Sequence, residues 1–319
     1  MNDELIQPSE PNKKPDKLLW VIGLIAILLV VAAITTYFLT RSTTNQSQQA
    51  SSFTSCPDVN KQHPGHCISS NISKASFKPN ESGTYQFAIL DAKNKPIKDF
   101  ETVHEKQMHV ILVRKDLAYF QHVHPVLDKQ TGIWTLDKLT LPADGPYRLF
   151  ADFTEGGTKS PVTVYEDFNV GDMAKYQKQP IGDTKEDKTF GNYQVILQTD
   201  PIVVQAGSEA KLVYLLSDAQ KGGASVTGLE PYLGAMGHAV ILSENLDFIH
   251  AHAMDDPTLA SRGVVEFMTT LPKEGKYKVF GQFQRSGEVF TTDFVLPVYG
   301  SLSPADHRIN SGSDVHSGH

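Results

Sequence analysis

Six histidines stand in two matching patterns, and imidazole is a side chain that binds transition metals or moves protons. The first pattern is His109 followed by His122 and His124, and the second is His238 followed by His250 and His252. Residues 145–153 (GPYRLFADF) match residues 275–283 (GKYKVFGQF) at a similar offset. This recurrence indicates two copies of one domain.

Each pattern fits a β-hairpin that places its three imidazoles on one face. Residues 109–114 and 119–124 flank a four-residue loop, so positions whose numbers sum to 233 lie opposite each other. His109 is then opposite His124, and His122 shares their face because strand side chains alternate. A five-residue loop keeps the same pairing in the second copy, where the sum is 490, for His238, His250 and His252.

Three clustered imidazoles suit zinc, copper or nickel, and neighbouring thioethers favour Cu(I). Met236 stands two positions before His238 and would share its face. Met108 directly precedes His109 and reaches the site only if the strand begins at that histidine. His104 could cap the first site, although a leucine replaces it in the second copy. We therefore predict copper, with zinc as the second choice, at His104, Met108, His109, His122, His124, Met236, His238, His250 and His252.

Another interpretation stays open. Histidines on a half-buried sheet face can hydrogen-bond one another or a backbone carbonyl without any metal, and the chain would then be an extracellular structural or protein-interaction module. A metal-dependent enzyme needs an open coordination position and a nearby general base. No catalytic triad, phosphate loop or nucleotide fingerprint is recognisable in the sequence. We therefore expect a binding protein and no enzyme.

The rest of the chain must position the histidines, and its pattern is that of an all-β protein. Short alternating runs broken by turn residues predict two tandem antiparallel β-sandwiches of the immunoglobulin-like kind, each of roughly seven strands. We place them at residues 70–170 and 189–300, joined by a polar linker at 171–188. Matching aromatic residues are expected in the sandwich cores: Phe120 and Phe248, Tyr147 and Tyr277, and Phe150 and Phe280.

The N-terminal part predicts a membrane anchor. Residues 18–40 are uncharged, mostly apolar and long enough to cross a bilayer as a helix. Three lysines precede the run and one arginine follows, so residues 1–17 should be a disordered cytoplasmic tail and the remainder should lie outside the plasma membrane. The alternative is a cleaved signal peptide, which is disfavoured by the length of the run and by the lack of a small-x-small cleavage pattern at residues 35–40.

Two short segments flank the predicted sandwiches. Residues 41–69 read as a stalk with a Cys/His loop, in which Cys56 and Cys67 form a disulfide or, together with His63 and His66, hold a soft metal. Residues 301–319 read as a disordered tail that contains histidines. The formal net charge of −7 gives no indication of a nucleic-acid partner.

The motif HxxxMH at 104–109, together with FxHxHP at 120–125 and the segment 145–153, resembles a group of bacterial secreted or membrane-anchored proteins. They are mostly uncharacterised and suspected of handling heavy metals. The resemblance covers roughly residues 95–170 and 225–300, although Ala253 stands where proline is expected after the second His-x-His. It implies extracytoplasmic location and copper handling, similar to the CopC group of small copper-binding sandwiches. That group's N-terminal copper motif has no clear match here.

Overall fold

The computed structural model describes residues 29–36, 65–70 and 77–300. The chain divides into two units, Met1–Thr54 and Ser55–His319, and all the strands lie in the second. In the first unit, residues 29–36 are helical, and the remainder of the predicted span 18–40 lies outside the described residues. Within the described ranges, no helix combines the length and apolar character needed to cross a bilayer. The predicted tails 1–17 and 301–319, like most of the stalk, also lie outside them.

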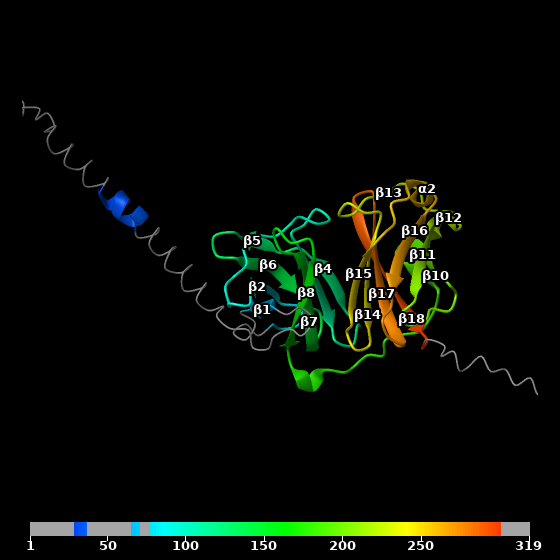
Figure 1. Cartoon of the computed structure of the whole chain (residues 1–319), viewed down its shortest axis with the longest axis horizontal. Coiled ribbons are helices and arrows are strands. Elements are labelled where there is room, and N and C mark those ends of the chain that lie inside the picture. Colours follow the sequence, from blue (N-terminus) through cyan, green and yellow to red (C-terminus); the bar gives the residue numbers. More distant parts are fainter. Residues whose placement is uncertain (1–28, 37–64, 71–76, 301–319) are drawn as a thin grey trace, which may run out of the picture. The chain divides into compact units, whose positions relative to one another are not determined.

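The first sandwich consists of two four-stranded antiparallel sheets, drawn in cyan and green in Figure 1. One sheet has the order β1-β2-β6-β5, with bounds Cys67–Ser70, Ser82–Leu90, Ile133–Thr140 and Val126–Asp128. The other has the order β4-β3-β7-β8, with bounds Phe120–Val123, Met108–Arg114, Gly145–Thr154 and Pro161–Val170. The second of these sheets carries the first histidine pattern.

The second sandwich consists of two five-stranded sheets. One sheet contains β9 to β12 and β16, with bounds Asp187–Phe190, Tyr193–Asp200, Glu209–Asp218, Ala224–Ser225 and Val264–Thr270. The other contains β13, β14, β15, β17 and β18, with bounds Leu229–Glu230, His238–Ser243, Phe248–His252, Gly275–Arg285 and Glu288–Val298. Short helical turns occur at Met173–Lys175, Ala219–Lys221 and Pro257–Ala260. The prediction of two tandem antiparallel sandwiches is therefore confirmed.

Each sandwich has its own apolar core between its two sheets. Strand alternation supplies both cores: Val110 and Leu112 of β3 face the first core, and Ala239 and Ile241 of β14 face the second. The largest aromatic side chains of the first core include Tyr85, Phe87, Trp134 and Tyr147. Those of the second include Tyr214, Phe267, Tyr277 and Phe283. These side chains hold each sandwich together through burial of apolar area.

A third apolar core joins the two sandwiches. Most of its residues come from the outer faces of the β3 and β14 sheets, and three come from the hairpin loops and the segment that joins the sandwiches. They are Ile111, Val113, Leu117, Phe150, Ile181, Val240, Leu242, Leu246, Phe280 and Val295. The rings of Phe120 and Phe280 stack at 4.3 Å, and those of Phe150 and Phe248 stack at 4.7 Å. The expectation that these four phenylalanines lie inside the sandwiches is wrong. They pack between the sandwiches, because β3 and β14 are buried on both faces.

The segment that joins the sandwiches takes part in this packing. Ile181 belongs to the third core, and its carbonyl oxygen accepts a hydrogen bond of 3.1 Å from Lys278 Nζ. The backbone N–H of Gln179 donates to the Asp116 carboxylate at 2.9 Å. Both contacts fix the segment against the sheets that carry the histidines.

Candidate metal centre

Both histidine hairpins have the predicted register. Val110 pairs with Val123 and Ile111 with His122, which is the pairing sum of 233 in the first copy. His238 pairs with His252, the pairing sum of 490 in the second. One nitrogen from each of His109, His122 and His124 lies within 4.8 Å of the others, and the same holds for His238, His250 and His252. We call these two sets cluster 1 and cluster 2.

The first histidine of each cluster is fixed by a backbone carbonyl. His109 Nε2 lies 3.1 Å from Val103 O, and His238 Nε2 lies 2.8 Å from Tyr232 O. A carbonyl oxygen only accepts, so each Nε2 carries the proton and each Nδ1 has a free lone pair. In the first cluster this carbonyl belongs to a tight turn whose central residues, His104 and Glu105, have positive φ.

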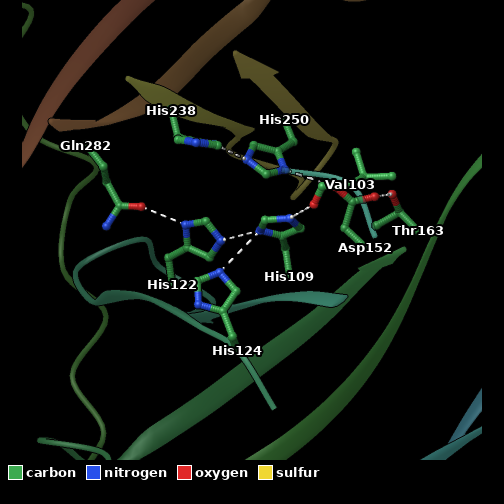
Figure 2. Close-up of polar contacts among 9 residues, drawn as sticks. All are labelled: Val103, His109, His122, His124, Asp152, Thr163, His238, His250 and Gln282. Carbon is green, nitrogen blue, oxygen red and sulfur yellow. Dashed lines mark hydrogen bonds and ion pairs between the residues drawn. The ribbon is translucent and has the colours of Figure 1, made fainter. Parts of the chain in front are cut away.

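The middle histidine of each cluster is fixed from the opposite sandwich. His122 Nδ1 lies 2.7 Å from Gln282 Oε1, and His250 Nδ1 lies 3.0 Å from Asp152 Oδ2 (Figure 2). Both partners accept through oxygen, so Nδ1 is protonated and Nε2 is the nitrogen with the lone pair. Gln282 takes this orientation because its amide nitrogen donates to Thr291.

The lone pairs of the fixed rings point toward one another. His109 Nδ1 lies 3.1 Å from His122 Nε2 and 3.3 Å from His124 Nε2. His238 Nδ1 lies 3.4 Å from His250 Nε2, and the buried Nε2 of His252 has no hydrogen-bond partner. Lone pairs facing at this distance repel unless a cation lies between them. Outer N–H groups held by acceptors with inner nitrogens left free are the usual arrangement of metal-binding histidines.

Burial keeps all six imidazoles neutral. It lowers the pKa of His109 below 6.5 and the pKa of both His122 and His250 far below it. Burial likewise lowers the pKa of His124 to about 3, of His238 to about 4 and of His252 to about 2. Neutral imidazole is the form that coordinates a metal ion, so the nitrogens are ready for coordination at neutral pH.

The two clusters lie side by side between the sandwiches, as Figure 2 shows for five of the rings. The ring centroids of His109 and His250 are 5.4 Å apart, and those of His122 and His250 are 5.6 Å apart. The predicted hairpins place each cluster on its own domain, and their spacing does not indicate that the two clusters meet. The signal was present in the uninterrupted apolar runs 110–113 and 239–242, which are typical of strands buried on both faces.

The three other predicted ligands, Met108, Met236 and His104, differ in their positions. Met108 is 1% exposed and packs in the core of the first sandwich, because β3 begins at Met108 and that side chain faces away from the histidines. Its inclusion as a ligand is wrong. Met236 precedes β14, which begins at His238, so the alternation used to place it does not apply. His104 does approach imidazoles, but those of the other cluster: its ring stacks on His252 at 3.6 Å.

The residues that orient the middle histidines were also missed. Asp152 and Gln282 occupy the same position of the matching segments 145–153 and 275–283. They lie on β7 and β17, beside the histidine strands β3 and β14. Each one contacts the histidine of the opposite copy, so their role depends on how the sandwiches dock.

The clusters open to solvent in different places. A cavity of about 740 Å³ is lined by His250 and His252 of cluster 2, by Asp152 and by His109. A separate hollow of about 590 Å³ reaches His122 and His124 of cluster 1, with Lys106 in its wall. An ion could therefore reach each cluster without passing through the other.

Fold and site together define a tandem β-sandwich protein with two three-histidine clusters at the contact between its sandwiches. The chain belongs to a family described as a domain of unknown function, DUF8832, whose model matches residues 66–169 and 188–300. No curated protein matches it.

Several solved structures share low similarity with the chain. The Escherichia coli adhesin FdeC is 17% identical with a TM-score of 0.24, over 74% of this chain and 63% of that one. CopC from Methylosinus trichosporium OB3b is 16% identical with a TM-score of 0.24, over 34% of this chain and 97% of that one. A titin fragment, I67-I69, is 10% identical with a TM-score of 0.19, over 71% and 62%.

Proposed function

We propose that this protein binds transition-metal ions, one at each three-histidine cluster, and that copper is the ion it takes. The convergence of unprotonated ring nitrogens, one of them the unpartnered Nε2 of His252, carries the proposal. Three imidazoles suit copper, zinc and nickel, and Cu²⁺ binds most tightly among the divalent ions of its row. Zinc is the second choice.

The role that we propose is binding and not catalysis. Asp152, a carboxylate in contact with cluster 2, accepts hydrogen bonds from Thr163 at 3.0 Å and from His250, so it serves to orient a ligand. A three-ligand site leaves a coordination position for a donor from solvent or from a partner. Such a position suits uptake and release of the ion.

We further propose that a helix at residues 18–40 anchors the chain and displays both sandwiches outside the plasma membrane. The uncharged run and the lysines before it support this orientation. Cys67 is disulfide-bonded, which fits an oxidising compartment and argues against the thiolate metal site considered for the Cys/His loop. The other cysteine, Cys56, lies outside the described residues. Protease added to intact cells tests this orientation, because it should remove the sandwiches. Sandwiches that stay uncleaved until the cells are lysed would contradict it.

Metal affinity tests the main proposal. The purified full chain is titrated separately with Cu(I), Cu(II) and Zn(II) against a chromophoric chelator, beside a variant carrying both His124→Ala and His252→Ala. The control is His66→Ala, because His66 lies outside the clusters and bonds Glu155. Two tightly bound ions per chain, retained in the control and lost in the double variant, support metal binding. The proposal fails if no ion binds with a micromolar or lower dissociation constant, about −8 kcal/mol. The histidines would then serve packing in an interaction module.

A further inference from the structure

The two clusters are built alike except at the groups that surround them. In each cluster the middle histidine bonds a residue of the opposite sandwich: His250 bonds Asp152, and His122 bonds Gln282. That residue in turn bonds a threonine on the next strand. Thr163 Oγ1 donates to Asp152 at 3.0 Å, and Gln282 Nε2 donates to Thr291 Oγ1 at 3.2 Å. The two threonines occupy equivalent cross-strand positions, opposite Asp152 in β8 and opposite Gln282 in β18.

The difference within this shared network is one charge. Cluster 2 has a carboxylate behind His250, whereas cluster 1 has a neutral amide behind His122. A carboxylate that accepts the outer N–H of a metal-binding histidine raises the basicity of the ligating nitrogen. It also attracts the cation directly, and this attraction is strong because the site is largely buried.

A second difference acts in the same direction. Lys106 lies on the turn before β3 and lines the hollow that reaches His122 and His124. The equivalent residue on the turn before β14 is Ala235, which carries no charge. A cation in cluster 1 is therefore opposed by a positive charge that cluster 2 does not have at that position.

We infer that the two clusters are unequal sites, that cluster 2 binds a divalent transition-metal ion first and more tightly, and that Asp152 of the opposite sandwich is the positioning residue that makes it so. This inference rests on the proposed function, because it assigns an order to the same two sites. The first ion bound depends on contacts from both sandwiches, and the second occupies the weaker cluster 1.

Single-cluster variants of the full chain allow each affinity to be measured. His124→Ala leaves cluster 2 intact and His252→Ala leaves cluster 1 intact, and neither removes a hydrogen bond between the sandwiches. Zn(II) competition titration should give cluster 2 an affinity about 10- to 100-fold higher, the usual effect of an outer-shell partner. The Cu(II) electron paramagnetic resonance spectrum of wild type with one equivalent should match that of His124→Ala.

Two reciprocal substitutions test the assigned cause. Asp152→Asn should weaken cluster 2 by about tenfold or more and shift the first Cu(II) spectrum of wild type toward that of His252→Ala. Gln282→Glu should strengthen cluster 1. The control Asp187→Asn removes an exposed carboxylate that also accepts from a side chain, Gln194 Nε2, at 3.0 Å, and should change neither affinity. Circular dichroism checks that each variant is folded.

The outcomes separate the two proposals. The inference would be overturned, with metal binding still supported, if the two clusters had equal affinities. It would also be overturned if Asp152→Asn left the affinity of cluster 2 unchanged and Gln282→Glu left that of cluster 1 unchanged. Failure of the wild type to bind Cu(II) or Zn(II) would overturn both.

Discussion

Removal of one aromatic ring between the sandwiches should uncouple their unfolding. Phe280 is 4% exposed and stacks on Phe120 with an interplanar angle of 13°. Replacing a buried phenylalanine by alanine costs about 3–5 kcal/mol through lost burial and the cavity left behind. Because this ring belongs to the core shared by both sandwiches, the loss falls on the coupling between them. Phe280→Ala should therefore destabilise the protein and divide one unfolding transition into two.

The measurement is urea unfolding of the unit Ser55–His319, followed by two signals. Trp134 is the only tryptophan in that unit and lies in the core of the first sandwich, so its fluorescence reports that sandwich. Far-ultraviolet circular dichroism reports the strands of both. The two curves should coincide in wild type, as expected of a cooperative unit. In Phe280→Ala the dichroism should change first, because Phe280 belongs to the second sandwich.

Phe267→Ala is the matched control. It removes an equally buried ring, but from the core inside the second sandwich. Phe267→Ala should lower the free energy of unfolding but leave the core shared by the two sandwiches complete. Coincident curves for Phe280→Ala, or a loss of less than about 1 kcal/mol against the 3–5 expected of a buried ring, would refute the view that the third core joins the sandwiches.

Three further changes have defined consequences. Burial alone would raise the pKa of Asp116, but the Arg114 guanidinium and backbone N–H donors lower it, so its charge stabilises the fold above the unfolded pKa of about 4. The stability difference between wild type and Asp116→Asn in urea titrations should therefore shrink as pH falls below about 4. Gly281→Ala should destabilise the second sandwich in thermal melts, because the new Cβ would lie 2.8 Å from the Tyr214 hydroxyl. His104→Ala should weaken cluster 2 alone in Zn(II) titrations, because His104 stacks on a ring of that cluster.

The histidine hairpins were predictable from sequence because their geometry is local. Strand alternation and loop length fixed which imidazoles share a face, and the observed pairs Ile111–His122 and His238–His252 agree. The thioether ligands were less secure, since the direction of Met108 depended on the residue at which the strand begins. The sequence also showed that segments 145–153 and 275–283 match, and with them Asp152 and Gln282.

What could not be predicted is the docking of one sandwich on the other. It brings together residues more than 90 positions apart, such as Asp152 and His250, and no local periodicity encodes such a contact. The composition of β3 indicated part of this arrangement, because a strand with one solvent-exposed face alternates polar and apolar residues. Residues 110–113 are all apolar and all buried. They indicate that the outer face is covered, but not by which partner.

The contacts between the sandwiches occur in reciprocal pairs, as in the interface of a symmetric dimer. Phe120 stacks on Phe280 while their counterparts Phe248 and Phe150 stack on each other. Joining both copies in one chain lets equivalent positions carry different residues, which a homodimer does not allow. The aromatic pairs use this freedom little, being phenylalanine on both sides. Around the histidines several equivalent positions differ. Those with a change of charge or of a ring are 104/233, 106/235 and 152/282, where the first copy has His, Lys and Asp and the second copy has Leu, Ala and Gln. The fused arrangement thus keeps the aromatic pairs of the shared core symmetric and allows asymmetry at the clusters, as the proposed unequal metal affinities would need.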